Sequence, residues 1–420
     1  MSPYRRQFLR GLLTAAGATS VGIRSAGAQH VHPAPARPPA GAAPRAEGGR
    51  GVVVTPDVPP LPWRLVDGVK EFHLVAEPVK TQFLPGRHVD VWGFNGHMPG
   101  PTIEIDEGDR VRFLVHNNLP EPFSMHWHGL EVPIEMDGGP GISQDPIAPG
   151  GTFTYEFTID QHGTFFYHSH MAMQELMGMV GFFVVRPRRA TTPRVDRDFG
   201  LIWQGWALLP NNTIPNTLAM EFNWLTMNGK AGPAATPLIV KVGERVRVRN
   251  VNLSMDHHPL HLHGNTFVVT GTEAGRIPDA QWQPGNTVLV GVAQARDFEF
   301  VASREGDWML HCHLPHHMMN QMIPMVGPMV TGHGHGAHRG AQPPRQVAAG
   351  LGEPDPTLVP GFPQDMAITM DEAVDKPETF GLRKGWTAGM MGMMTLIRVV
   401  SPTLFDQIAE RRRVLDGRPA

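Results

Sequence analysis

The sequence contains a single cysteine, Cys312, among its 420 residues. One thiol cannot form an internal disulfide, so the chain must fold without one. An excess of charge of one sign is also lacking, because 36 basic and 39 acidic residues leave a formal net charge of −3. This balance gives no indication of a nucleic-acid-binding protein. In an oxidising compartment, an isolated cysteine is expected to be buried or to serve as a ligand.

A long hydrophobic run is missing as well, including at the N-terminus. There Arg5 and Arg6 precede a modest apolar stretch and an Ala-x-Ala site at residues 26–28, which resembles a twin-arginine export signal. The apolar stretch is shorter than the roughly 20 residues of a membrane-spanning helix, which disfavours an anchor. We expect residues 1–28 to be removed as a signal peptide. The mature protein is then expected to be periplasmic or secreted, with no membrane span.

Glycine and proline are abundant, with 47 and 41 residues, which is high for a helical protein. Short runs of alternating apolar and polar residues, such as 102–114 and 238–249, are typical of strands between turns. The sequence therefore predicts an all-β fold. Residues 29–62 are dense in proline, alanine and glycine and are predicted to form a tether.

An internal repeat organises the rest of the chain. An Asn-Gly pair, an alternating strand, a Gly-Asp or Gly-Glu turn and a second strand lead to HWHG at 126–129 and to HLHG at 261–264. This order is typical of a Greek-key β-sandwich. We predict sandwiches over 63–190 and 198–331, an interdomain linker near 187–200, and a C-terminal extension over 332–420 with a helix at 402–415.

Paired histidines recur in both repeats. Side chains at positions i and i+2 of a strand point to the same face, so each His-x-His motif presents two imidazoles together. The two repeats contain four such pairs: His126/His128, His168/His170, His261/His263 and His311/His313. Eight imidazoles suit a multinuclear metal site, because neutral imidazole binds copper, zinc and iron. Cys312 lies inside the last pair and must point to the opposite face, so one strand is expected to serve two metal centres.

The face of Cys312 has further candidate ligands. His258 lies shortly before His261, and His317 and Met322 follow Cys312 in HCHLPHHMMNQM. Two imidazoles, a thiolate and a weakly bound thioether are the ligands of a blue-copper electron-transfer site, whereas zinc has no use for such a methionine. These residues predict a type 1 copper centre.

The motifs resemble those of the multicopper oxidases, in particular their two-domain, small-laccase-like form. HWHG, GTFFYHSH, HPLHLHG and HCHLPHHMMNQM occur in the family's order, and the resemblance covers roughly residues 63–330. It implies two cupredoxin-like domains and four copper ions per functional unit, one of type 1, one of type 2 and two of type 3. Carried over by motif, His126 and His261 would hold the type 2 ion. The type 3 pair would be held by His128, His168, His170, His263, His311 and His313.

The resemblance also implies an activity. A reducing substrate would give single electrons to type 1 copper, and Cys312 with its two histidine neighbours would pass them to a trinuclear cluster that reduces dioxygen to water. Asp137, in EMDGGPG, matches the family's acid beside the cluster and would supply protons, although an Asp-Gly turn explains the same residues. Where many three-domain relatives have a second acid, this chain has Pro315.

The resemblance further implies how subunits assemble and which electron donors they use. In the two-domain form the first domain of one subunit faces the second domain of its neighbour, so we expect a homotrimer with clusters at the interfaces. The electron donor would be a phenol, an aryl amine or a low-valent metal ion such as Cu(I). Methionines gather near 171–179, 318–329 and 390–394, where thioethers could bind Cu(I) or fill gaps in the core. The histidines of the loop at 333–338 suit copper uptake or a plain linker.

Two other functions remain open. A trimeric copper nitrite reductase shares the fold, but its type 1 cysteine lies in the first domain, where this chain has Ser169. A periplasmic copper-storage or copper-tolerance protein would use histidine and methionine clusters without turnover. Storage does not need a thiolate joined to paired histidines, so the oxidase is the leading interpretation.

Overall fold

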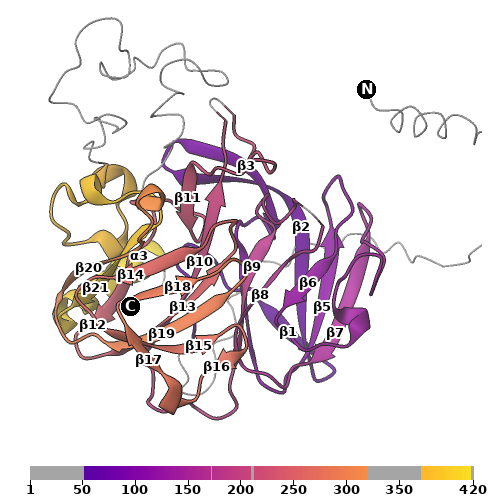
Figure 1. Ribbon diagram of the computed structural model, residues 1–420, viewed down its shortest axis with the longest axis horizontal. Helices are drawn as coiled ribbons and strands as arrows, with labels where there is room; N and C mark the ends of the chain where they lie inside the picture. Colours follow the sequence, from indigo (N-terminus) through magenta and orange to yellow (C-terminus); the bar gives the residue numbers. More distant parts are fainter. Residues whose placement is uncertain (1–51, 172, 210–211, 319–369, 418–420) are drawn as a thin grey trace, which may run out of the picture. The chain divides into compact units, whose positions relative to one another are not determined.

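The computed structural model describes residues 52–171, 173–209, 212–318 and 370–417. The predicted signal peptide, most of the predicted tether, Met322 and the histidine-rich loop lie outside these residues. Within them, the strands form four sheets and α3 (Pro402–Leu415) is the only α-helix (Figure 1). The predicted all-β fold and the terminal helix are confirmed. Short 3-10 helices lie at Ile134–Met136, Asp279–Gln281, Pro315–Met318, Asp371–Val374, Pro377–Thr379 and Trp386–Gly389.

The first sandwich packs a five-stranded sheet on a four-stranded one. The first sheet has the order β1-β2-β5-β7 with β3 beside β2, and comprises β1 (Trp63–Val66), β2 (Val69–Leu84), β3 (Arg87–Phe94), β5 (Arg110–Asn117) and β7 (Thr152–Thr158). The second has the order β4-β9-β8-β6, from β4 (Gly100–Asp106), β6 (Met125–His128), β8 (Gly163–Ser169) and β9 (Val180–Arg186). Aromatic residues fill the core between them, and the rings of Phe113 and Trp127 lie 4.4 Å apart.

The second sandwich packs a seven-stranded sheet on a five-stranded one. The larger sheet contains β10 (Arg197–Trp206), β11 (Trp224–Met227), β13 (Arg245–Asn252), β15 (Phe267–Thr272), β16 (Gly275–Arg276), β17 (Gln283–Gly285) and β19 (Ala295–Val301). The smaller has the order β12-β21-β20-β14-β18, from β12 (Leu238–Lys241), β14 (His258–Leu262), β18 (Thr287–Val290), β20 (Gly306–Cys312) and β21 (Met394–Val400). This second sheet positions most of the predicted ligands of its domain.

One strand of the second sandwich comes from the predicted C-terminal extension. β21 pairs with β12 on one side and with β20 on the other, so it lies inside the sheet. The sequence pattern ended this domain at residue 331, whereas the structure adds residues 394–400 to it. All seven residues of β21 are buried, including Arg398, which pairs with Asp307 at 2.7 Å. A strand buried on both faces lacks the alternation that marks a half-buried strand.

α3 follows β21 directly, and its first residues carry the signals of a helix N-terminus. The Ser401 hydroxyl accepts a hydrogen bond from the Leu404 amide at 3.3 Å, and Pro402 occupies the first helical position, where no amide donor is needed. Ile408 on the inner face of the helix packs against Ile239 and Val400. The helix is thereby fixed to the second sandwich.

The end of the predicted tether, residues 52–62, packs along both sandwiches. Val54 forms a β-bridge with Phe199 of the second sandwich, and Pro60 forms one with Thr102 of the first. Three of the segment's aliphatic side chains are buried. These last residues are therefore part of the folded core, despite a composition that favours a linker.

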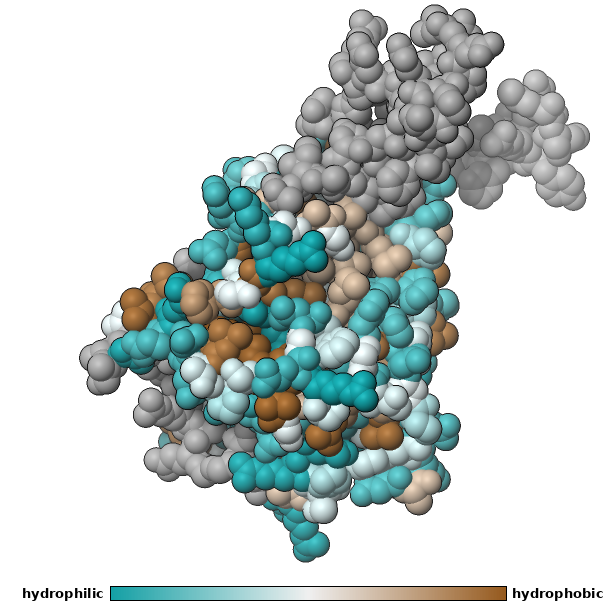
Figure 2. All heavy atoms as spheres, turned by 90° about the vertical axis from the view of Figure 1, so that its left-hand side faces the viewer, coloured by the Kyte–Doolittle hydropathy of each residue, from teal (hydrophilic) through white to brown (hydrophobic). Residues whose placement is uncertain are grey.

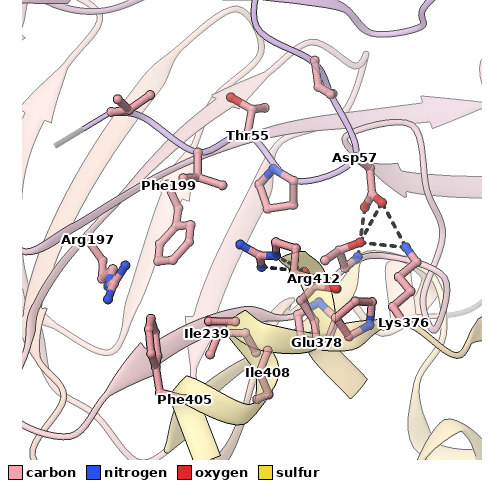
Figure 3. A pocket seen from close by; sticks show the side chains of 18 of the residues that line it. Thr55, Asp57, Arg197, Phe199, Ile239, Lys376, Glu378, Phe405, Ile408 and Arg412 are labelled. Carbon is pink, nitrogen blue, oxygen red and sulfur yellow. Dashed lines mark hydrogen bonds and ion pairs between the residues drawn. The ribbon is translucent and has the colours of Figure 1, made fainter. Parts of the chain in front are cut away.

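A cavity of about 930 Å³ lies between this segment, β12 and α3 (Figure 3). On one side of it the Asp57 carboxylate accepts hydrogen bonds from Lys376 at 2.9 Å and from the Thr236 hydroxyl at 2.7 Å. On another, Arg412 donates to Glu378 at 2.8 Å. Among the described residues, none of the predicted copper ligands lines this cavity. The ion pair between Asp57 and Lys376 holds the N-terminal and C-terminal segments together.

The first sandwich also contacts a group of ion pairs that is buried in the second. Arg249 of β13 contacts Asp198 at 2.7 Å and Asp297 at 3.4 Å. The Thr164 hydroxyl of β8, in the first sandwich, donates to Asp297 at 2.8 Å. Arg249 also donates to the Thr164 hydroxyl at 2.8 Å, so this hydroxyl connects the first sandwich to the charged group of the second.

The exterior of the described part mixes residue types. On the face shown in Figure 2, hydrophobic residues form separate patches among hydrophilic ones. Among the described helices, none has both the length and the hydropathy needed to cross a membrane.

Candidate metal centres

Four histidines of the first sandwich gather on the outer face of the sheet that contains β6 and β8. The strand register places His126 opposite His168. His128 shares the face of His126, because Trp127 between them points into the core. His170 directly follows β8. The His126 ring lies 5.2–5.6 Å from the other three ring centroids, so the structure brings all four predicted ligands together.

Backbone carbonyls fix the orientation and the tautomer of two of these imidazole rings. The Nδ1 atom of His126 lies 2.8 Å from the Asp137 carbonyl, and that of His168 lies 2.9 Å from the Ser169 carbonyl. A carbonyl can only accept, so each Nδ1 carries the ring proton and each Nε2 keeps its lone pair. Burial lowers the pKa of His128 to about 4 and that of His168 to about 3. Both rings are therefore neutral near pH 7, as metal binding requires.

Two carboxylic acids contact this first-domain set. Asp137 caps the C-terminal end of the 3-10 helix at Ile134–Met136, and its carboxylate lies 3.5 Å from Nδ1 of His126. The Glu175 carboxylate lies 3.4 Å from Nδ1 of His168, and burial raises the pKa of Glu175 to about 7. The sequence predicts Asp137 through its motif. It gives no indication of Glu175, which a turn after β8 brings back to the histidines.

The second sandwich gathers its four histidines in the same way. β14 and β20 pair with His261 opposite His311. The His261 ring lies 4.9–5.7 Å from the rings of His263, His311 and His313. Again a backbone carbonyl accepts from Nδ1, at 2.8 Å for His261 and 2.9 Å for His311. The Nε2 atoms of His263 and His311 face each other at 3.0 Å. This is a second group of imidazoles arranged for metal binding.

The two histidine sets do not meet within one chain. Ring contacts join the histidines inside each set, and among the described residues none joins a histidine of one set to a histidine of the other. In Figure 1, β6 and β8 lie on one side of β10, and β14 and β20 lie on the other. Each chain therefore presents two separate histidine sets.

A third group of ligands lies inside the second sandwich. The Cys312 sulfur is 3.4 Å from Nδ1 of His317 and 3.7 Å from Nδ1 of His258. The two Nδ1 atoms are 3.1 Å apart, and all three residues are buried. Cys312 points into the core while its neighbour His311 joins the outer set. Three of the four predicted type 1 ligands are thus together, and Met322 lies outside the described residues.

The chemistry of this buried group fits copper. Burial raises the pKa of the Cys312 thiol to about 12 and lowers that of His258 to about 3, so the thiol and this imidazole are both neutral near pH 7. A bound cation offsets the cost of ionising the buried thiol, because a coordinating thiol loses its proton. The Cys312 thiolate and the imidazoles of His258 and His317, buried together, match the donor set of a type 1 copper site.

Two features hold these ligands in place. Pro315 begins the 3-10 helix at Pro315–Met318 that carries His317. The backbone of Met393, just before β21, contacts both ligand segments. Its N–H donates to the His317 carbonyl at 2.8 Å, and its carbonyl accepts from the Cys312 N–H at 3.1 Å. The C-terminal segment therefore supports the site.

The methionines of the tail are part of the protein interior. Met390, Met393 and Met394 are each at most 6% exposed. Met390 and Met394 pack in one cluster with the partly buried Met318. Their burial suits packing, which was one of the two uses that the sequence left open.

Family models described as multicopper oxidase match residues 76–190 and 209–327, one in each sandwich. The chain belongs to the multicopper oxidase family. It is 42% identical over 113 residues to a copper resistance protein A homolog of Pseudomonas syringae pv. tomato, covering 27% of this chain and 19% of that protein. It is 32% identical over 237 residues to laccase-2 of Botryotinia fuckeliana, covering 51% and 40%.

Among solved structures, this multicopper oxidase resembles the blue copper oxidase from Nitrosomonas europaea. The TM-score is 0.55 at 30% identity, over 60% of this chain and 81% of that one. The chain spans less than half the length of the two curated relatives above. The matches of the two family models contain the histidine motifs of both sandwiches.

Proposed function

We propose that the protein couples the one-electron oxidation of a reducing substrate to the four-electron reduction of dioxygen to water. The observation that carries the proposal is the position of Cys312. Its sulfur belongs to a buried group with His258 and His317, while its chain neighbours His311 and His313 belong to a separate histidine set. Such a connection suits electron transfer between two centres. A copper-storage protein would have no use for it.

Copper bound at these donors would supply one-electron transfer and dioxygen chemistry, and the chain's own residues determine where each occurs. His258, Cys312 and His317 would hold type 1 copper, with Met322 as the predicted fourth ligand. His126 and His261 would hold type 2 copper. The remaining six histidines would hold the type 3 pair: His128, His168, His170, His263, His311 and His313. The Asp137 carboxylate, which lies 3.5 Å from His126, would hold and deliver protons beside the first histidine set.

The trinuclear site requires a second copy of the chain, because the two histidine sets of one chain lie apart. Each set is therefore one half-site, the first in the first sandwich and the second in the second. The outer faces that carry them also carry exposed apolar side chains. Leu289 of β18 is 57% exposed beside the second set, and Ile134 is 61% exposed near Asp137 in the first. A head-to-tail contact between the two faces, repeated by a closing rotation, gives a ring. We propose a homotrimer with three interfacial clusters.

Light scattering is therefore expected to show a trimer that separates into monomers when Leu289 is changed to arginine. The new charge would be buried against the neighbouring subunit without a partner. Leu289→Arg should lose dioxygen uptake yet keep the type 1 colour, since His258, Cys312 and His317 belong to one chain. Leu65→Arg is the control, because Leu65 is 67% exposed on the far sheet of the first sandwich. A monomer with full oxidase activity would contradict the assembly.

The electron donor is proposed to be a phenol, an aryl amine or a low-valent metal ion such as Cu(I). The relatives include both a laccase and a copper resistance protein, so both donor classes are tested together. Oxygen uptake should be recorded with a phenol, Cu(I), Fe(II) and Mn(II) side by side. Uptake with none of them would favour copper storage. We also propose a periplasmic or secreted location, reached by the twin-arginine route, from residues 1–28.

The tail methionines are expected to act by packing. Replacing Met390, Met391, Met393 and Met394 by leucine roughly preserves apolar volume, at less than about 1.5 kcal/mol per swap. The ratio of Cu(I) to phenol oxidation rates should therefore stay unchanged even if both rates fall. Steady-state rates on the two donors check this. A selective loss of Cu(I) oxidation would show instead that the tail captures the ion.

A further inference from the structure

One loop contacts the outward nitrogens of both type 1 histidines. It connects β13 to β14 and contains Ser254 and Asp256. The Ser254 hydroxyl oxygen lies 2.7 Å from Nε2 of His258, and the Asp256 carboxylate lies 3.6 Å from Nε2 of His317. The Nδ1 atoms of both rings face the Cys312 sulfur. The loop therefore holds the edges of the rings that point away from the predicted copper.

The partners of Ser254 determine the direction of its hydrogen bond to His258. Its oxygen also lies 3.0 Å from Oδ1 of Asn252 and 3.1 Å from the Asp256 carbonyl. Both of these oxygens can only accept, so they compete for the one hydroxyl proton. The hydroxyl must then accept from His258, whose Nε2 carries the ring proton. This leaves the Nδ1 lone pair directed at Cys312.

The amide group of Asn252 makes this arrangement rigid. Its Nδ2 donates to the Asp256 carbonyl at 2.8 Å and to the Val290 carbonyl at 3.0 Å. Those two acceptors fix which end of the amide faces Ser254. Asn252 is fully buried and Ser254 is 4% exposed, so water does not compete for these bonds.

His317 receives a different kind of support. The side chain of Asp256 is 45% exposed, whereas that of His317 is 9% exposed. At 3.6 Å the contact is electrostatic rather than a close hydrogen bond. A carboxylate oxygen attracts an N–H and repels a nitrogen lone pair, so it favours the Nε2–H tautomer, as Ser254 does at His258. Unlike a hydroxyl, it also adds a negative charge beside the ligand. Negative charge near a copper ion favours the higher oxidation state and lowers the reduction potential.

We propose that Ser254 and Asp256 are positioning residues of the type 1 centre. They hold His258 and His317 as Nε2–H tautomers, so that both Nδ1 lone pairs converge on one point beside Cys312. Asp256 in addition lowers the potential at which the centre accepts an electron. This inference rests on the proposed function, because it requires copper at Cys312.

The first test replaces the hydroxyl. Ser254→Ala should weaken retention of the blue copper about 10–100-fold, the usual cost of losing an outer-shell partner. The measurement is loss of the blue band in full-length, copper-loaded protein during titration with a copper chelator. Ser254→Thr keeps the hydroxyl and should restore retention. Ser401→Ala, which removes the helix cap of α3, is the control for loss of a hydrogen bond far from the site.

The second test removes charge but keeps a hydrogen-bond acceptor. Asp256→Asn should raise the reduction potential of the blue copper in a spectroelectrochemical titration, whereas Asp279→Asn, an exposed aspartate of the same domain, should not. If the wild-type protein binds copper without turning blue, the type 1 assignment itself fails. If the wild type is blue and both Ser254→Ala and Asp256→Asn match it in retention and potential, the positioning role is overturned and the oxidase assignment stands.

Discussion

Substituting Cys312 by serine is expected to bleach the copper-loaded protein and to reduce dioxygen uptake to background. The blue colour of a type 1 centre arises from charge transfer between a thiolate sulfur and copper, and Cys312 is the sequence's one cysteine. A serine hydroxyl in the same place neither ionises readily nor gives such a band. The two histidine sets should keep their copper, since the second set lies on the other face of the sheet and the first set lies in the other sandwich.

The first repeat shows that serine is compatible with this position. In HSH, Ser169 occupies the place of Cys312, and its buried hydroxyl donates to Gln174 at 2.7 Å. At position 312 an unpaired hydroxyl costs about 1–3 kcal/mol, so circular dichroism should accompany the spectra. Copper content should fall by the type 1 ion alone. A Cys312→Ser protein that stays blue would refute the assignment of this thiol.

The strand rule explains why so much of the site could be predicted from the sequence. Alternation is a property of the extended backbone, so His-Cys-His had to place sulfur and imidazoles on opposite faces wherever the strand lay. The structure indeed places Cys312 in the core and His311 in the outer set. The repeat likewise implied two sandwiches, because both copies share the same order of turns and strands.

Contacts made through tertiary structure could not be predicted in this way. β21 returns to the sheet after a long interval of sequence, and its continuous burial hides the two-residue period. Glu175 and Asp256 reach the histidines through turns, where side-chain direction follows no simple period. The separation of the two half-sites also depends on how the sandwiches pack, through contacts such as Thr164 with Asp297.

Replacing His126 by alanine is expected to abolish dioxygen reduction while leaving the blue band intact. His126 contacts the other three histidines of the first set, whereas all described type 1 ligands come from the second sandwich. Absorption spectra and oxygen uptake on the same sample separate the two effects. His88→Ala, at an exposed histidine of β3, should change neither. Surviving oxidase activity in His126→Ala would place the cluster elsewhere.

Mixed assemblies then distinguish a cluster between subunits from one within a chain. His126→Ala damages the first half-site, and His261→Ala damages the second, so each variant alone should be inactive. In a ring, the intact first half-site of a His261→Ala chain can face the intact second half-site of a His126→Ala chain. In random co-assembly, about a quarter of the interfaces combine two intact half-sites. At each interface a His261→Ala chain must supply the first half-site and, independently, a His126→Ala chain must supply the second. Co-expression should therefore restore about a quarter of wild-type uptake, whereas intrachain clusters would stay inactive in every mixture.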